Sequence, residues 1–191
     1  SFHLCNKFYN IKSTARLDQN LFNLYNNLNN MDEKRVILGG DHSMSIATVA
    51  DSLNRNPNTK VLWIDAHADI NTPESSVSKN VHGMPLSFLT GLASQRELLN
   101  YTFIKNKLDF QNLMYIGLRD IDPFEKMILE EKKINVITVN ELETNFDKML
   151  LEIEKFISYD DIHISFDVDS LDPKVLPCTG TKADEGITLQ T

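Results

Sequence analysis

The sequence predicts an α/β fold of three layers, in which helices cover both faces of a mostly parallel central sheet. Two observations predict it. Short, nearly continuous apolar runs recur along the chain, as is typical of strands buried on both faces. Segments with helical periodicity separate these runs, and such alternation indicates parallel strands joined by crossover helices. With 191 residues and no low-complexity linker, we expect one domain over residues 1–191.

The expected elements follow one another in a regular order. A first helix is predicted by apolar residues at helical spacing, namely Leu17, Leu21, Leu24, Tyr25 and Leu28. The expected strands are the apolar runs Val36–Leu38, Val61–Ile64, Leu113–Leu118, Val136–Val139 and Ile162–Phe166. Before the last run, an apolar stripe from Phe146 to Ile157 predicts another helix with its charged residues outside.

The composition narrows the class of protein. The net charge of -8 disfavours a nucleic-acid partner, because phosphate binding requires a basic face. No apolar run is long enough to cross a bilayer, and the first residues show no signal-peptide pattern. Cys5 and Cys178 lie far apart and suggest no disulfide framework, which favours a reducing compartment. We therefore expect a cytoplasmic protein that acts on a small molecule.

Acidic and imidazole groups follow two of the apolar runs directly. Asp65, His67 and Asp69 occupy every second position after the run that ends at Ile64. After the last run, "FDVD" repeats this spacing with two more aspartates. The carboxyl ends of parallel strands meet at one edge of the sheet, where ligands bind in open α/β folds. The sequence therefore predicts that these side chains converge there.

A third contribution comes from His42 in "GGDHS", which follows the first apolar run. Four carboxylates and two imidazoles in one place require a positive counter-charge. A mixed set of this size suits two divalent transition ions such as manganese, which share bridging carboxylates. Each motif alone has a plainer interpretation, because a single Asp-x-His is usually a cap or a solvated turn. The convergence of three strand ends favours the metal site.

Three blocks carry a resemblance to a known family. "GGDHS", "DAHADINTPESSVSKNVHGMP" and "SFDVDSLDPKVLPCTGT" are similar to the signature blocks of the ureohydrolase superfamily. The segments "NTP", "HGMPLSFL" and "GLRDID" resemble the arginase family within it, and the resemblance covers the chain from about Arg35 onwards. It implies an arginase/deacetylase-like α/β/α fold, two Mn²⁺ per chain, and hydrolysis of L-arginine to L-ornithine and urea. It also implies a homotrimer at full length.

The resemblance assigns roles residue by residue. The implied metal ligands are His42, Asp65, His67, Asp69, Asp167 and Asp169. The implied catalytic residues are His82, as a proton shuttle, with Asp69 and Asp169. The implied substrate-binding residues are Asn71, Ser76, Ser78, Asn80, Asp120, Asp122 and Thr181. The resulting hypothesis is attack of a metal-bridging hydroxide on the guanidinium carbon, with the departing amine protonated with help from Asp169 or His82.

The sequence departs from the family pattern at two places. Lys79 stands where the family usually has a glycine in the substrate loop, and we expect its side chain to point to water. The family also has a guanidinium-recognising carboxylate beyond the "TGT" block, so we expect a domain that is incomplete at both ends. Two alternatives stay open. One is an agmatinase or another guanidino-hydrolase, and the other is a catalytically incomplete metal-binding fragment.

Overall fold

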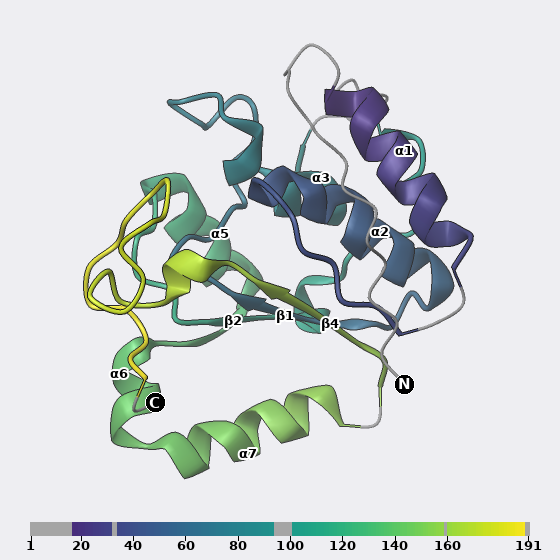
Figure 1. The fold of residues 1–191 in the computed structure, drawn as a ribbon. Coiled ribbons are helices and arrows are strands. Elements are labelled where there is room, and N and C mark those ends of the chain that lie inside the picture. The colour runs from purple at the N-terminus through teal and green to yellow at the C-terminus, as the bar shows by residue number, and fades with distance from the viewer. Residues whose placement is uncertain (1–16, 32–33, 94–100, 159, 190–191) are drawn as a thin grey trace.

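A sheet of four parallel strands forms the centre of the protein, as a computed structural model shows (Figure 1). The structure describes residues 17–31, 34–93, 101–158 and 160–189. The strands are β1 (Lys60–Ile64), β2 (Leu113–Ile116), β3 (Asn135–Ile137) and β4 (Ile162–Phe166). Their spatial order is β3-β2-β1-β4, and every neighbouring pair is parallel. The predicted parallel sheet is therefore confirmed.

Helices separate the strands along the chain. The α-helices are α1 (Leu17–Asn29), α2 (Ser45–Arg55), α3 (Pro85–Thr90), α5 (Pro123–Lys132), α6 (Val139–Thr144) and α7 (Phe146–Ile157). Among the described residues, the short 3-10 helices are η2 (His42–Met44), η3 (Val81–Gly83), η5 (Phe110–Asn112) and η6 (Val168–Ser170). The predicted first helix and the predicted helix before the last strand are both present, as α1 and α7. None of the helices in the described ranges is long and apolar enough to span a membrane.

The side chains of β1 divide the core into two halves. Val61 and Trp63 point to one face, where they pack in a cluster with apolar residues of α1, α2, α3 and α5. Leu62 and Ile64 point to the other face and belong to a second cluster with residues of α6 and α7. Because successive side chains of a strand alternate between faces, this apolar run fills both cores. The sheet thus lies between two helical layers, as predicted.

The order of the strands places a switch point between β1 and β4. From β1 the chain proceeds to β2 and β3 on one side, and it then returns to add β4 on the opposite side. The loops that leave neighbouring strands in opposite directions open a space at their carboxyl ends. Asp65, which follows β1, and Asp167, which follows β4, lie on the two sides of this switch point.

Two strand predictions need correction. Val36–Leu38 is not a strand, and its side chains are largely exposed, with 60% exposure at Val36 and 85% at Leu38. Within the described ranges no strand lies beside it, and an apolar run without a neighbour cannot form a ladder. The run that begins at Val136 ends as a strand at Ile137, because Thr138 caps α6 by accepting a hydrogen bond from the Glu141 N–H.

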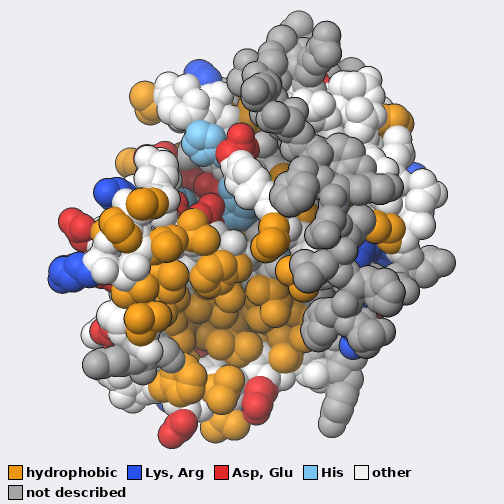
Figure 2. Space-filling view, viewed as in Figure 1, with side chains coloured by type: hydrophobic (Ala, Val, Ile, Leu, Met, Phe, Trp, Pro, Cys, Tyr) orange, Lys and Arg blue, Asp and Glu red, His pale blue; other side chains and the backbone are white. Residues whose placement is uncertain are grey.

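β4 and α7 carry an exposed apolar surface, which we call the β4–α7 face. β4 pairs with β1 and with no other strand in the described residues. The exposed members of this face are Phe146, Leu150, Leu151, Ile162, Ile164 and Phe166. Figure 2 shows hydrophobic side chains gathered in this region of the molecule. The apolar stripe of α7 was predicted correctly, but only Met149 of that helix is buried.

Candidate metal centre

The candidate site lies at the carboxyl ends of β1 and β4. The backbone N–H of Asp167 donates to the Ile64 carbonyl at 2.9 Å, so the chain continues the β1–β4 pairing beyond the strands. The N–H of Asp65 likewise donates to the Ile116 carbonyl at the end of β2, at 3.1 Å. These bonds bring "DAHAD" and "DVD" side by side, although about a hundred residues separate them in the sequence.

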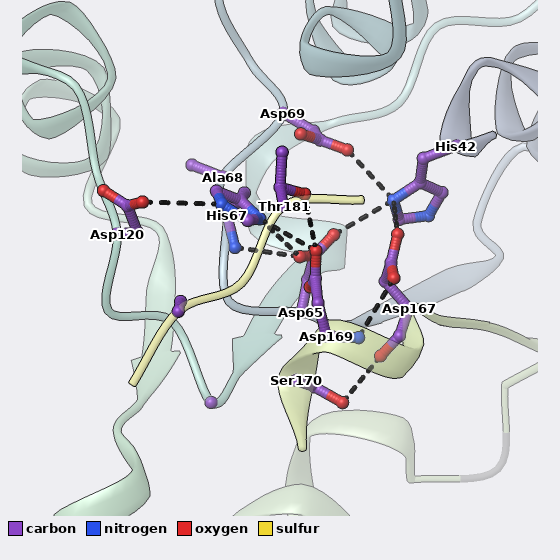
Figure 3. A network of polar contacts seen from close by, with 12 residues as sticks. His42, Asp65, His67, Ala68, Asp69, Asp120, Asp167, Asp169, Ser170 and Thr181 are labelled. Carbon is purple, nitrogen blue, oxygen red and sulfur yellow. Dashed lines mark hydrogen bonds and ion pairs between the residues drawn. The ribbon is translucent and has the colours of Figure 1, made fainter. Parts of the chain in front are cut away.

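His42 begins η2 and reaches this site from the face of the sheet that carries Trp63. Asp41 caps η2 by accepting hydrogen bonds from the backbone N–H and the hydroxyl of Ser43. The imidazole of His42 stacks on the ring of Trp63 at 4.2 Å, and its Nε2 lies 2.7 Å from the Ser165 hydroxyl on β4. These two contacts fix the ring so that Nδ1 faces the carboxylates, as Figure 3 shows.

Nδ1 of His42 lies close to three carboxylate oxygens at once. The distances are 2.9 Å to Oδ2 of Asp69, 3.0 Å to Oδ2 of Asp65 and 3.3 Å to Oδ2 of Asp167. No contact has hydrogen-bond geometry, and Nδ1 is a buried nitrogen without a hydrogen-bond partner. A nitrogen and several oxygens that face one point without bonding to each other are arranged as ligands of a cation.

A second group shares Asp65 with the first. Nδ1 of His67 lies 3.3 Å from Oδ2 of Asp169 and 3.5 Å from Oδ1 of Asp65. The ligand atoms of His42, Asp65 and Asp69 all lie within 4.8 Å of one another, and so do those of Asp65, His67 and Asp169. One carboxylate therefore belongs to two adjacent three-residue groups, and Asp167 contacts the first of them.

Neighbouring groups hold these carboxylates in place. Oδ1 of Asp65 accepts from the backbone N–H of His67 at 2.8 Å, and Oδ2 accepts from the indole N–H of Trp63 at 3.0 Å. Oδ2 of Asp169 accepts from the Thr181 hydroxyl at 3.0 Å, while Oδ1 is buried without a hydrogen-bond partner. Asp69 has a left-handed backbone with φ of 50°, which aspartate tolerates better than most residues.

The charges of the cluster shift the pKa values of its members. Burial lowers the pKa of His42, but contacts with Asp65 and Asp69 outweigh this effect and raise it to about 10. Asp169 and then Asp65 raise the pKa of His67 to about 11, against the effect of burial. Burial raises the pKa of Asp69 to about 7, although His42 counteracts it. Without a metal ion, the two imidazoles therefore carry protons at neutral pH.

Metal binding is expected to displace these protons. Imidazole binds a metal only in its neutral form, so two ions that bind at pH 8 must release about two protons, one from each histidine. Affinity should rise with pH. Calorimetric titration with Mn²⁺ in two buffers of different ionisation enthalpy measures the number of protons released.

The stability of the metal-free protein should change with pH in the opposite direction, falling as pH rises. The protonated histidines stabilise the fold below about pH 6.5, and this contribution is lost as pH rises through 10 to 11.

A release close to zero would contradict this prediction, because it would mean that both imidazoles are already neutral before the metal binds. Injection of Mn²⁺ into the same buffer without protein gives the heat of dilution as the control.

Six of the seven predicted substrate-binding residues lie in the segments that follow β1 and β2, and Thr181 lies in the segment that follows η6. The side-chain amide of Asn71 donates to Oδ2 of Asp122 at 2.8 Å, which joins the loop after β1 to the start of α5. Asp120 is 68% exposed at its side chain, and its Oδ2 lies 3.5 Å from Nε2 of His67. Thr181 contacts Asp169, as described above. Asp120 and Thr181 therefore contact the cluster, Asn71 and Asp122 contact each other, and the roles of all four stay predictions.

The rest of the loop that follows β1 packs on itself. The Ser76 hydroxyl is buried, accepts from the backbone N–H of Lys79 at 3.0 Å and lies 3.5 Å from the Ser78 hydroxyl. Asn80 is exposed and precedes η3, which carries His82 and packs against the helix η2 that begins with His42. The assigned role of His82 also stays a prediction.

Lys79 is placed differently from the expectation. Its backbone is left-handed, with φ of 61°, which explains why a glycine suits this position. Its ammonium group donates to the Pro73 carbonyl at 2.6 Å and so turns back onto its own loop. The side chain therefore bridges the loop at the surface instead of pointing freely to water.

Sequence reasoning missed several supporting residues. Glu125 is buried, and its two oxygens accept from the backbone N–H groups of Ile70 and Asp122 at 3.1 and 3.0 Å. The spacing Asp122-Pro-Phe-Glu125 is that of a capping box and could have revealed it. Trp63 lies two positions before Asp65 on the same side of the strand, which is also visible in the sequence. The contact of Ser165 with His42 has no local signal.

Comparison with known proteins identifies relatives along most of the chain. The model of the Arginase family matches residues 5–191. An arginase of Neurospora crassa is 45% identical over 162 residues, which are 80% of this chain and 45% of that protein. "Arginase-2, mitochondrial" of Rattus norvegicus is 40% identical over 164 residues, with the same shares of the two chains. The chain thus spans about half the length of the curated relatives it matches.

Solved structures show the same fold. An arginase from Bacillus subtilis superposes with a TM-score of 0.87 at 32% identity, over 95% of this chain and 65% of that chain. An Entamoeba histolytica arginase, solved in complex with L-ornithine, gives a TM-score of 0.83 at 33% identity, over 92% and 62%.

Proposed function

We propose a function from one premise, which is that this chain belongs to the arginase family. The proposed reaction is the hydrolysis of L-arginine to L-ornithine and urea by an amidinohydrolase with two manganese ions. The observation that carries the proposal is the pair of three-residue groups that share Asp65. Two adjacent sites with one shared carboxylate are the arrangement of a two-metal hydrolase.

The donor set fits two manganese ions. His42, Asp65, Asp69 and Asp167 would hold one ion, and His67, Asp65 and Asp169 would hold the other. Mixed imidazole and carboxylate donors suit Mn²⁺ better than Ca²⁺ or Mg²⁺, which seldom bind histidine. The unpartnered Nδ1 of His42 and Oδ1 of Asp169 are the buried atoms that such ions would satisfy. Bound in pairs, ions of this kind generate a nucleophile from water near neutral pH.

The protein groups orient the site and move protons. Ser165 fixes the ring of His42 through Nε2 and so keeps its Nδ1 available on the side of the carboxylates. The carboxylate of Asp169 lies next to His67 and Thr181, and we assign to it help in protonating the departing amine. We assign to His82, on the neighbouring η3, the transfer of that proton from solvent.

The two loops beside the cluster would bind the amino-acid end of the substrate. Asn71 and Asp122 are already joined, and their remaining donor and acceptor capacity suits an α-carboxylate and an α-amino group. We assign the same task to Ser76, Ser78, Asn80 and Asp120, with Thr181 as a further contact. An assay that compares L-arginine with agmatine, which lacks the α-carboxylate, tests these assignments directly.

Urea release from the two substrates is the decisive measurement. We expect kcat/KM for L-arginine to exceed that for agmatine by about 10⁴-fold, because unsatisfied polar groups strongly reject an analogue that lacks their partner. In the same assay, His82→Ala should lower kcat by about 10²-fold, with little change in KM. His82→Gln serves as the matched polar control and should not restore kcat.

Each alternative has its own outcome. Faster urea release from agmatine would identify an agmatinase-type enzyme instead. If Mn²⁺ raised the melting temperature while no guanidino compound released urea, the chain would be a metal-binding piece without catalysis.

The assembly and compartment are also proposals. We propose a homotrimer for the full-length protein, which sedimentation equilibrium would test, and a cytoplasmic location. The mitochondrial name of one relative marks the alternative compartment, and fractionation of the source cells distinguishes the two.

A further inference from the structure

The guanidinium of Arg119 is surrounded by main-chain carbonyl oxygens. Arg119 follows β2 in the segment "GLRDID", and the structure gives its side chain six hydrogen bonds. The acceptors and distances are the carbonyls of Asp169 (2.7 Å), Ala183 (2.9 Å), Asp184 (2.9 Å), Gly117 (3.1 Å), Ser170 (3.1 Å) and Leu171 (3.5 Å). All of these acceptors are backbone groups, so the contact has no side-chain partner that a substitution could exchange.

These carbonyls belong to three separate segments. One lies at the end of β2, three lie in the turn 169–171 that carries the metal-ligand candidate Asp169, and two lie in the loop 183–184. Ile187, three residues after this loop, is also joined to the turn by backbone hydrogen bonds. Its N–H donates to the Ser170 carbonyl at 2.9 Å, and its carbonyl accepts from the Asp172 N–H at 2.9 Å. Arg119 is thus the side chain that fastens the turn and the loop to the end of β2.

The same segments support the second group of the candidate metal centre, which consists of Asp65, His67 and Asp169. Thr181, at the start of the loop, donates to Oδ2 of Asp169, the oxygen that faces His67. The backbone N–H of Arg119 itself donates to the Ala66 carbonyl at 2.9 Å, next to His67. Because Ala66 lies between Asp65 and His67, Arg119 contacts the chain beside all three residues of this group. Its side-chain bonds reach neither His42 nor Asp69, which belong to the other group.

The charge of Arg119 favours the same half of the cluster. Burial lowers its pKa, while the carboxylates of Asp169 and Asp172 counteract that shift. Because its hydrogen bonds go to neutral carbonyls, the positive charge is not neutralised by a carboxylate in contact. The charge of Arg119 therefore offsets part of the negative charge of the Asp169 carboxylate.

We propose that Arg119 is a positioning residue for the metal ion held by Asp65, His67 and Asp169, and that it sets the affinity of this ion without touching it. The inference rests on the metal centre of the proposed function and goes beyond it by separating the two ions. Lysine cannot replace Arg119 in this role, because an ammonium has three donors at one point and cannot span three segments.

The test measures the two manganese affinities separately in the full chain. Electron paramagnetic resonance counts free Mn²⁺ during a titration, and the variant His67→Asn identifies the binding step that belongs to the His67 group. Arg119→Lys and Arg119→Met should weaken that step by about 10- to 100-fold, the usual cost of losing an outer-shell contact. The other step should change by less than about 3-fold.

Arg35→Lys is the matched control. Arg35 also binds the main chain, at the Leu28 carbonyl, and pairs with Asp51, far from the Asp169 turn. It should lower the melting temperature without changing the ratio of the two affinities. Equal weakening of both steps in the Arg119 variants, or no weakening, would overturn the inference.

A second measurement uses the unmodified protein and does not depend on a folded variant. Backbone hydrogen exchange of residues 169–171 and 183–187 should slow together when the His67 step is saturated. Independent exchange of the two segments would also overturn the inference. If the unmodified protein bound fewer than two ions, the proposed metal centre itself would fail, which is a different result.

Discussion

Replacement of Asp65 by asparagine is expected to abolish binding of the two proposed metal ions and, with it, the proposed urea release. Asp65 contributes one oxygen to each of the two groups, and its side chain is only 1% exposed. Loss of a residue that only supports a metal ligand typically lowers metal affinity by about 10- to 100-fold. Loss of a ligand shared by two ions should lower the affinity for each ion by more than about 100-fold. Asparagine keeps the size of the side chain but offers a neutral carbonyl in place of a bridging carboxylate.

Metal content after dialysis and urea release from L-arginine measure this effect. The control Asp147→Asn removes an equal charge from the first turn of α7, far from the cluster, and should leave both quantities unchanged. Retention of one tightly bound ion in Asp65→Asn would show that the two groups are independent, and the two-metal arrangement would then be wrong.

Removal of the metal is expected to lower the melting temperature by about 8–16 °C. A ligand present at about 1,000 times its Kd stabilises the folded state by about 4 kcal/mol, and each kcal/mol shifts the midpoint by about 2–4 °C at this chain length. The physical cause is the set of four carboxylates at the ends of β1 and β4. Without dications, these carboxylates face protonated His42 and His67, with the guanidinium of Arg119 behind Asp169.

Thermal unfolding before and after chelation, followed by addition of Mn²⁺, measures the shift. Mg²⁺ at the same concentration is the control and should restore less, because it rarely binds imidazole. Trp63 is the only tryptophan in the chain, and it contacts both His42 and Asp65. Its fluorescence should therefore change with metal binding, and a chelated protein with unchanged stability and unchanged emission would contradict the prediction.

The sequence predicts the parts of this protein that depend on local pattern. Alternation of apolar runs and helical stripes identified the parallel sheet, and the ligand candidates follow from a single rule about strand ends. Asp65 and Asp167 come from distant segments, yet each directly follows an apolar run that forms a strand, so the pattern was sufficient to predict that they converge. His42 was expected beside them for the same reason, but the run before it is not a strand, and η2 places it there instead.

The parts that sequence reasoning missed depend on distant partners. Val36–Leu38 has the composition of a strand, but a strand forms only where a neighbour offers hydrogen bonds, and no residue in its own segment reveals that neighbour. Arg119 presents the same difficulty in another form. Its acceptors are backbone carbonyls of three segments, and backbone carbonyls are the same in every residue type.

The edge of β4, which pairs with no second strand in the part of the chain that the structure describes, has a consequence for handling the protein. An unpaired parallel edge beside apolar side chains is a template to which a strand of another molecule can add. Ile162, Ile164 and Phe166 alternate with polar residues along this edge, and no proline interrupts them. Where the edge stays bare, preparations of these residues should aggregate on warming or concentration, and a lysine in place of Ile164 should act as a gatekeeper against it.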